Sequence, residues 1–117
     1  MTDRHLTITL QSDWKASLRH VAKSAKSGAY QGEVLNFETP AQFFGQLTEK
    51  RWDLVRAAQG RGELPVRELA RIVGRDVKRV HEDIGILTEL GLLERTDNGG
   101  VCCPYTSMHI DMHLKAA

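Results

Sequence analysis

The sequence predicts an α+β fold, in which strand patterns near both ends of the chain flank a series of amphipathic helices. Residues 6–10 and 108–114 alternate apolar and polar side chains, with the period of two that half-buried strands show. Between residues 39 and 90, apolar side chains recur instead at the helical spacings of three and four. A glycine-rich turn at residues 96–100 then separates two short apolar runs, as in a β-hairpin.

The first 38 residues are expected to form a strand, a helix and a second strand. Residues 6–10 alternate leucine or isoleucine with threonine, which favours a half-buried strand. A helix is expected over residues 12–28, with Trp14 and Leu18 on its apolar face. Residues 32–38 are expected to form the second strand.

Two threonines are expected to cap the next two helices. Thr39 precedes a proline, which is favoured at the first helical position, and Thr48 begins a helix that continues to about residue 59. The side chains of the first helix that are expected to face the core are Phe43, Phe44 and Leu47. Residues 60–65 contain two glycines and a proline, so a loop is expected there.

A helix-turn-helix is the strongest local signal in the chain. Residues 66–73 and 76–90 each repeat apolar side chains at helical spacing, and only a few residues around Gly74 separate them. The second helix is the longer one, and its polar first turns are expected to face outward.

A wing is expected directly after this motif. Residues 92–103 read as two short strands around Asn98-Gly99, a pair that supplies the positive φ angles that hairpin turns need. The predicted fold is therefore an α+β winged helix-turn-helix with an additional N-terminal strand-helix-strand segment. Residues 1–38 would form that segment and residues 39–117 the DNA-binding domain, packed together as one compact unit.

Basic residues gather in the middle of the chain. The 117 residues carry a net charge of only +1. Residues 50–81 nevertheless hold nine basic side chains against four acidic ones, whereas residues 82–117 hold two against six. A basic block inside a near-neutral chain indicates a local footprint for a polyanion, although a solvated basic face has the same composition.

The second helix of the motif is expected to enter the major groove of DNA, because a helix fits that groove and its first turns point side chains at base edges. The side chains expected to contact bases are Arg75, Lys78, Arg79, His81 and Glu82. Cations of the preceding helices and polar residues of the wing are expected to contact phosphates. These are Lys50, Arg51, Arg67, Arg71, Arg95 and Asn98.

A homodimer is expected, because one helix-turn-helix covers few base pairs and proteins of this class gain affinity by binding two half-sites. The interface residues expected are Trp14, Leu18, Met108, Ile110 and Met112. The same two segments could instead complete the core of a monomer, and the sequence leaves both interpretations open.

Other chemistry has little support in the sequence. The side chains of Cys102, Cys103, His109 and His113 are of metal-ligating types. Their spacing matches no common zinc module, so whether they bind metal stays open. No catalytic triad or glycine-rich phosphate loop is evident, so neither an enzyme nor a cofactor is expected. Apolar runs are too short for a membrane span and no secretory signal is recognisable, so a cytoplasmic protein is expected.

Residues 66–74, with Val80, Leu87 and residues 90–94, resemble the winged helix-turn-helix of MarR-like transcriptional regulators. The whole chain is similar to a group of small predicted regulators of bacteria and archaea that are often encoded beside toxin genes. The resemblance implies double-stranded DNA as a partner and a repressor that also acts as an antitoxin. The alternative is an interaction module in which residues 1–38 neutralise a cognate toxin and DNA binding is secondary.

Overall fold

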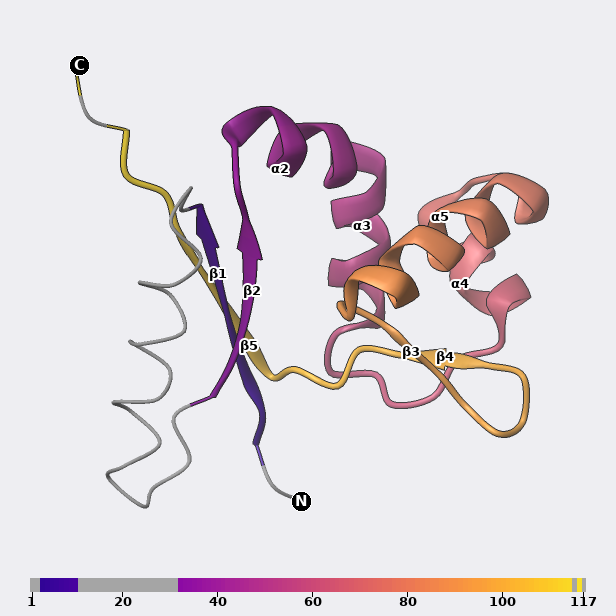
Figure 1. Cartoon of the computed structure of the whole chain (residues 1–117). Coiled ribbons are helices and arrows are strands. Elements are labelled where there is room, and N and C mark those ends of the chain that lie inside the picture. Colours follow the sequence, from indigo (N-terminus) through magenta and orange to yellow (C-terminus); the bar gives the residue numbers. More distant parts are fainter. Residues whose placement is uncertain (1–2, 11–31, 115, 117) are drawn as a thin grey trace. The chain divides into compact units, whose positions relative to one another are not determined.

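The computed structural model of the chain describes residues 3–10, 32–114 and 116 (Figure 1). They form an α+β fold of helices and short strands, as the sequence predicts. The chain divides into two compact units, one made of Met1–Gly45 and Ser107–Ala117 and the other of Gln46–Thr106. The helix expected over residues 12–28, with Trp14 and Leu18, lies outside the described residues.

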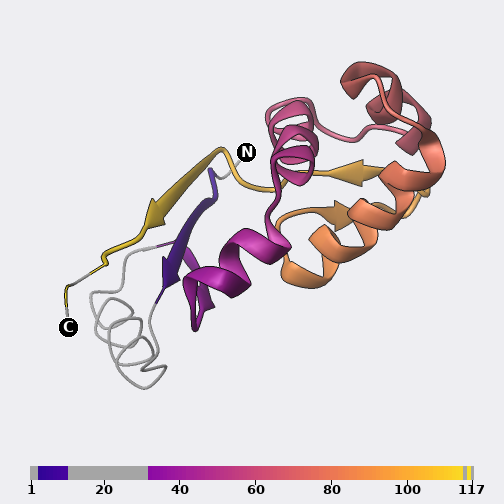
Figure 2. The same ribbon diagram turned by 90° about the horizontal axis from the view of Figure 1, so that it is seen from above.

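The first unit contains a three-stranded sheet with the order β2-β1-β5. The strands are β1 (His5–Leu10), β2 (Glu33–Phe37) and β5 (Ser107–Asp111). All three expected strands are present, but the last one ends at Asp111 and not at residue 114 as predicted. Both pairings of β1 are parallel, and the arrows of β1 and β5 point the same way in Figure 2. The central strand therefore joins residues from opposite ends of the chain.

One face of this sheet is apolar. The register places Ile8 of β1 beside Leu35 of β2 and Ile110 of β5, so the three side chains lie in one row on the same face. Ile8 and its neighbour Leu6 on that face are buried. On the opposite face, β1 and β5 carry the polar residues that alternate with these apolar ones, as the sequence pattern predicts. Strand β2 departs from this pattern, because its register places Val34 on the opposite face and Glu33 at the edge of the apolar face.

Helix α2 (Pro40–Gln46) begins at the expected cap. The Gln42 N–H donates to the Thr39 hydroxyl at 3.1 Å. Phe43 is buried and meets the ring of Phe37 edge to face, with ring centroids 5.5 Å apart. The prediction was wrong for Phe44, which is 59% exposed, because the next position along a helix lies about 100° around its axis.

The second unit contains the other expected helices. They are α3 (Glu49–Ala58), α4 (Val66–Val73) and α5 (Val77–Leu90). The hydroxyl of Thr48 caps α3 and the carboxylate of Asp76 caps α5, each by accepting a backbone N–H. Gly74 ends α4 in the left-handed region at a φ of 68°, a conformation that glycine adopts without strain. Apolar side chains of all three helices form the core of this unit, with Leu54, Leu69 and Leu87 fully buried.

A β-hairpin follows α5. Strands β3 (Glu94–Arg95) and β4 (Val101–Cys102) pair in antiparallel fashion. The Gly99 N–H bonds to the Thr96 carbonyl, and only Gly99 of the expected Asn98-Gly99 pair has a positive φ. The prediction of positive φ angles for both residues was therefore wrong for Asn98. The loop between the two strands, residues 96–100, is three residues longer than a two-residue hairpin turn. In this longer loop Gly99 is the residue in the left-handed conformation.

The hairpin is also bonded to the loop before α4. Leu64 and Val101 exchange two backbone hydrogen bonds, both 2.8 Å long. The start of α4 and the hairpin are thus joined within one unit.

The boundary between the two units differs from the expected boundary, which lay between residues 38 and 39. Residues 39–45 belong to the first unit, and so does β5. Strand β5 hydrogen-bonds to β1 and completes the N-terminal sheet, and Phe43 of α2 packs against Phe37 of β2. Among the described residues, no helix has the length and hydropathy needed to cross a membrane.

Candidate nucleic-acid interface

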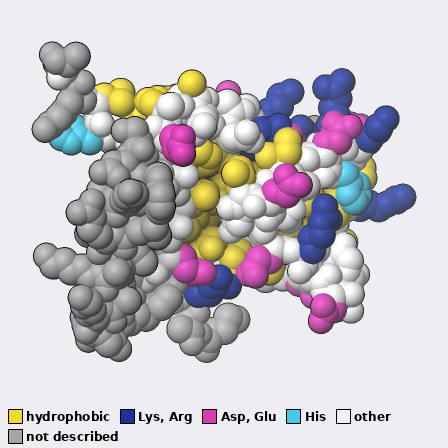
Figure 3. Space-filling view, in the orientation of Figure 1, with side chains coloured by type: hydrophobic (Ala, Val, Ile, Leu, Met, Phe, Trp, Pro, Cys, Tyr) yellow, Lys and Arg dark blue, Asp and Glu magenta, His cyan; other side chains and the backbone are white. Residues whose placement is uncertain are grey.

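The surface of α5 divides into a buried side and an exposed charged side. Val80, Ile84 and Leu87 are fully buried, because their spacing of four and three keeps them on one face of the helix. The four charged or titratable side chains of the first turns that are exposed are Lys78, Arg79, His81 and Glu82. Figure 3 shows Lys and Arg side chains gathered over α4 and α5. Four of the five residues expected to contact bases therefore face solvent.

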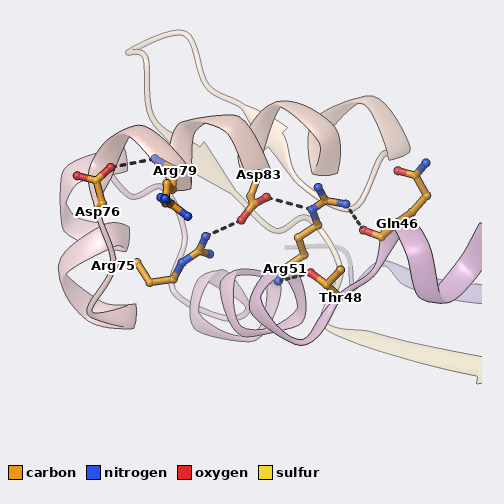
Figure 4. A network of polar contacts seen from close by, with 7 residues as sticks. All are labelled: Gln46, Thr48, Arg51, Arg75, Asp76, Arg79 and Asp83. Atoms are coloured by element: carbon orange, nitrogen blue, oxygen red, sulfur yellow. Dashed lines mark hydrogen bonds and ion pairs between the residues drawn. The ribbon is translucent and has the colours of Figure 1, made fainter.

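Arg75 is the exception, because its guanidinium points inward to Asp83 of α5 (Figure 4). The Arg75 Nη2 lies 2.8 Å from Asp83 Oδ2, and the two side chains are only 17% and 16% exposed. This ion pair sets Arg75 apart from the four exposed residues, and its contact with bases stays a prediction. Its charge is compensated by the carboxylate two turns further along the chain.

Arg51 is engaged by the same carboxylate. Its Nε donates to Asp83 Oδ1 at 3.0 Å, and its Nη1 donates to the Gln46 carbonyl at 2.7 Å. Arg51 thus already has two partners within the chain, and its contact with a phosphate stays a prediction. We call Arg51, Arg75 and Asp83 the Asp83 cluster; it joins α3, the α4–α5 turn and α5 (Figure 4).

The environment of Asp83 changes its ionisation. Burial alone raises the pKa of this carboxyl, but the hydrogen bonds from Arg75 and Arg51 outweigh burial and hold the pKa below its ordinary value. Asp83 is therefore a carboxylate at neutral pH. Two arginines share one carboxylate, and the Nη1 of Arg75 is buried without a hydrogen-bond partner among the described residues.

The two arginines of α4 that are expected to contact phosphates differ in their surroundings. Arg67 is exposed. Arg71 forms a two-fold hydrogen-bonded ion pair with Glu68, one turn back, through Nε at 3.0 Å and through Nη2. That hydrogen bond lowers the pKa of Glu68 and raises the pKa of Arg71. Arg71 remains largely solvent-exposed, so a phosphate could still approach its guanidinium.

An open hollow separates α4, α5 and the hairpin tip. Its volume is about 300 Å³. Three of the predicted contact residues converge on it from the three segments, namely Arg67, His81 and Asn98. Glu63 also lines the hollow, and its carboxylate accepts a hydrogen bond of 2.6 Å from the Thr96 hydroxyl. The hollow has no signal in the sequence, because it depends on the hydrogen bonds between Leu64 and Val101 that hold the hairpin beside α4.

The remaining predicted residues are not among those that line the hollow. Lys50 of α3 and Arg95 of β3 are exposed, and Ile110 of β5 is exposed in the first unit. Met108 and Met112 are half-buried. The sequence left Asp83 unassigned, although one signal was present: it is an acidic residue on the same face of its helix as the buried Val80 and Leu87.

The cysteines and histidines do not form a metal site in the part of the chain that is described. Among those residues, no three His, Cys, Asp or Glu side chains are placed to hold a metal ion. Neither Cys102 nor Cys103 takes part in a disulfide bond among the described residues. Burial raises the pKa of Cys103, which keeps this thiol protonated and weakly reactive at neutral pH.

One family of proteins matches the chain. The sequence model of the HVO_A0114 family matches residues 46–110, which are more than half of the chain. The match spans the whole second unit and ends within β5. No curated protein and no solved structure matches the chain.

Proposed function

The chain belongs to the HVO_A0114 family, and we propose that its second unit binds double-stranded DNA as a winged helix-turn-helix and so acts as a transcriptional regulator. The observation that carries this proposal is that α5 has one buried side and one exposed, charged side. Its inner side packs in the core, while its first turns expose Lys78 and Arg79 to solvent. A helix that is held firmly and presents cations at its start has the form needed to enter a major groove.

The connection between α4 and α5 supports this role. The cap of α5 is the Asp76 side chain, and the left-handed Gly74 ends α4 only two residues earlier. Two helices joined by so short a turn form a helix-turn-helix, and the hairpin that follows α5 takes the place of a wing.

The hollow supplies a second contact. Arg67 and Asn98 line it from α4 and from the hairpin, beside His81 of α5. We propose that the phosphate backbone adjoining the major groove runs along this hollow, where Arg67 neutralises a phosphate and Asn98 donates a hydrogen bond. Lys78 and Arg79 would then face the bases, and arginine pairs two-fold with guanine.

The experiment is a fluorescence anisotropy titration of the full chain against two labelled duplexes, the DNA upstream of its own coding sequence and a scrambled duplex of equal composition. Salt is varied from about 50 to 200 mM, a range over which binding through phosphates weakens steeply. We expect tighter binding to the upstream duplex, and this preference should persist at the higher salt concentration.

Matched variants connect that binding to α5. The double variant Lys78→Ala, Arg79→Ala should lose the preference for the upstream duplex. Arg56→Ala removes another exposed cation, from the last turn of α3, and should leave the preference intact. Equal affinity for both duplexes, or no binding at low salt, would overturn the proposal.

A further inference from the structure

The apolar face of the sheet in the first unit is buried at its centre and open at one edge. In the row that joins Ile8 to Ile110, Ile8 is fully buried whereas Ile110 of β5 is 44% exposed. All the large hydrophobic side chains that are exposed in the described part of the chain belong to this unit. They are Val34, Phe44, Ile110 and Leu114.

The edge strand β5 offers backbone groups as well as apolar side chains. It pairs with β1 on one side only, and no other described strand or loop forms a backbone hydrogen bond with residues 107–111. The strand lacks the proline and lysine residues that commonly protect such edges. Within the described part of the chain, the outer side of β5 thus presents N–H and C=O groups without backbone partners beside the exposed Ile110, and such a row is a template for a further strand.

The sequence of β5 complements itself in the antiparallel direction. When Ser107–Asp111 is paired with a reversed copy centred on His109, Met108 lies opposite the partner's Ile110. Ser107 lies opposite the partner's Asp111, so a hydroxyl faces each carboxylate and no two acids face each other. The strand β2 at the other edge lacks this property, because in the same arrangement its Val34 would lie opposite an asparagine.

We propose that the occupant of this edge is β5 of a second copy of the chain. The two copies form a continuous six-stranded sheet in the order β2-β1-β5-β5-β1-β2, with a two-fold axis through the paired His109 residues. An axis perpendicular to the sheet keeps the apolar faces of both copies on the same side, so Met108 and Ile110 of each copy are covered by their counterparts. The interface uses residues of the first unit and does not depend on DNA binding.

The test begins with the mass of the full chain in solution. Sedimentation at about 50 µM should give the mass of two chains. Ile110→Lys should raise the dissociation constant of the dimer at least about tenfold, because it places a charge within the paired apolar side chains. Val34→Lys is the matched control, because Val34 is 41% exposed at the opposite edge, and it should leave the dimer unchanged. Circular dichroism verifies that both variants fold.

Cross-linking tests the register directly. In a chain carrying Cys102→Ser and Cys103→Ser, the substitution His109→Cys places one thiol of each copy beside the axis, and mild oxidation should yield a covalent dimer. Val34→Cys in the same background should not cross-link. A wild-type chain that sediments as a monomer, a dimer that only Val34→Lys disrupts, or a folded dimer in which His109→Cys does not cross-link would overturn the proposal.

Discussion

Asp83 accepts a hydrogen bond from Arg75 across 2.8 Å, and this contact fixes the turn between α4 and α5 to a point two turns inside α5. The same carboxylate accepts a hydrogen bond from Arg51 of α3. One acidic side chain therefore sets the position of α5 relative to both neighbouring segments. In the proposed function, this contact determines the angle at which Lys78 and Arg79 are presented.

Asp83→Asn should lower the free energy of unfolding by on the order of 3 kcal/mol, because it leaves two poorly exposed arginines without their carboxylate. Urea denaturation followed by circular dichroism measures the change. Glu82→Gln is the matched control at the adjacent exposed position, and its effect should stay within about 0.5 kcal/mol. Equal effects of the two substitutions would show that the Asp83 cluster does not hold the helices together.

The contribution of the cluster should also depend on pH. The pKa of Asp83 is lower in the folded chain than its ordinary value of about 3.9, so the folded state favours the carboxylate. The stabilisation is present above that ordinary value and is lost as the pH falls through the lower, folded pKa. The stability difference between the wild type and Asp83→Asn should thus shrink below about pH 4. Urea midpoints between pH 3 and pH 7 measure it, and a constant difference would contradict this account.

Substitutions of two arginines that are only four positions apart should affect different properties, DNA affinity in one case and stability in the other. Arg79→Ala should weaken binding to the specific duplex by about 1 to 3 kcal/mol and leave stability nearly unchanged, since its side chain is exposed. Arg75→Ala should lower stability, because it removes a hydrogen-bonded partner of Asp83. Anisotropy titrations and thermal unfolding of both variants provide the comparison. If Arg79→Ala retains wild-type affinity, Arg79 does not contact bases.

Two glycines near the motif should also respond in opposite ways to alanine. Gly85 lies inside α5, and an added methyl group would have no neighbouring atom within 4 Å, so Gly85→Ala should stabilise the chain by about 0.5 to 1 kcal/mol. Gly74 has a φ of 68°, and Gly74→Ala should destabilise it by about 1 kcal/mol even though space is available. Thermal unfolding measures both. Stabilisation by Gly74→Ala would be incompatible with a left-handed end of α4.

The helices and strands were largely predictable because local signals define them. Thr39 and Thr48 cap the helices that their positions indicated. The misassignment of Phe44 shows the limit of such signals, since an apolar side chain in a short helix can face either way. The parallel arrangement of β5 and β1 had no local signal, because it depends on a pairing between distant segments.

The candidate interface was predictable for the exposed cations and not for the buried ones. Counting charges located the basic block, but such a count does not distinguish Arg51 and Arg75 from Lys78 and Arg79. Only the position of Asp83 separates the two pairs, since it draws the first pair inward. The hollow was missed for a related reason, because it is formed by hydrogen bonds between residues 64 and 101.

The pairing of β1 with β5 joins His5 to Ser107, 102 positions apart, whereas the second unit consists of the uninterrupted stretch Gln46–Thr106. A chain that emerges from the ribosome one residue at a time therefore exposes β1 long before its partner strand exists. Contacts so distant in sequence also carry the greater loop-closure entropy and form slowly. We expect the second unit to fold first during synthesis, and the sheet to be completed only after the last strand has been translated.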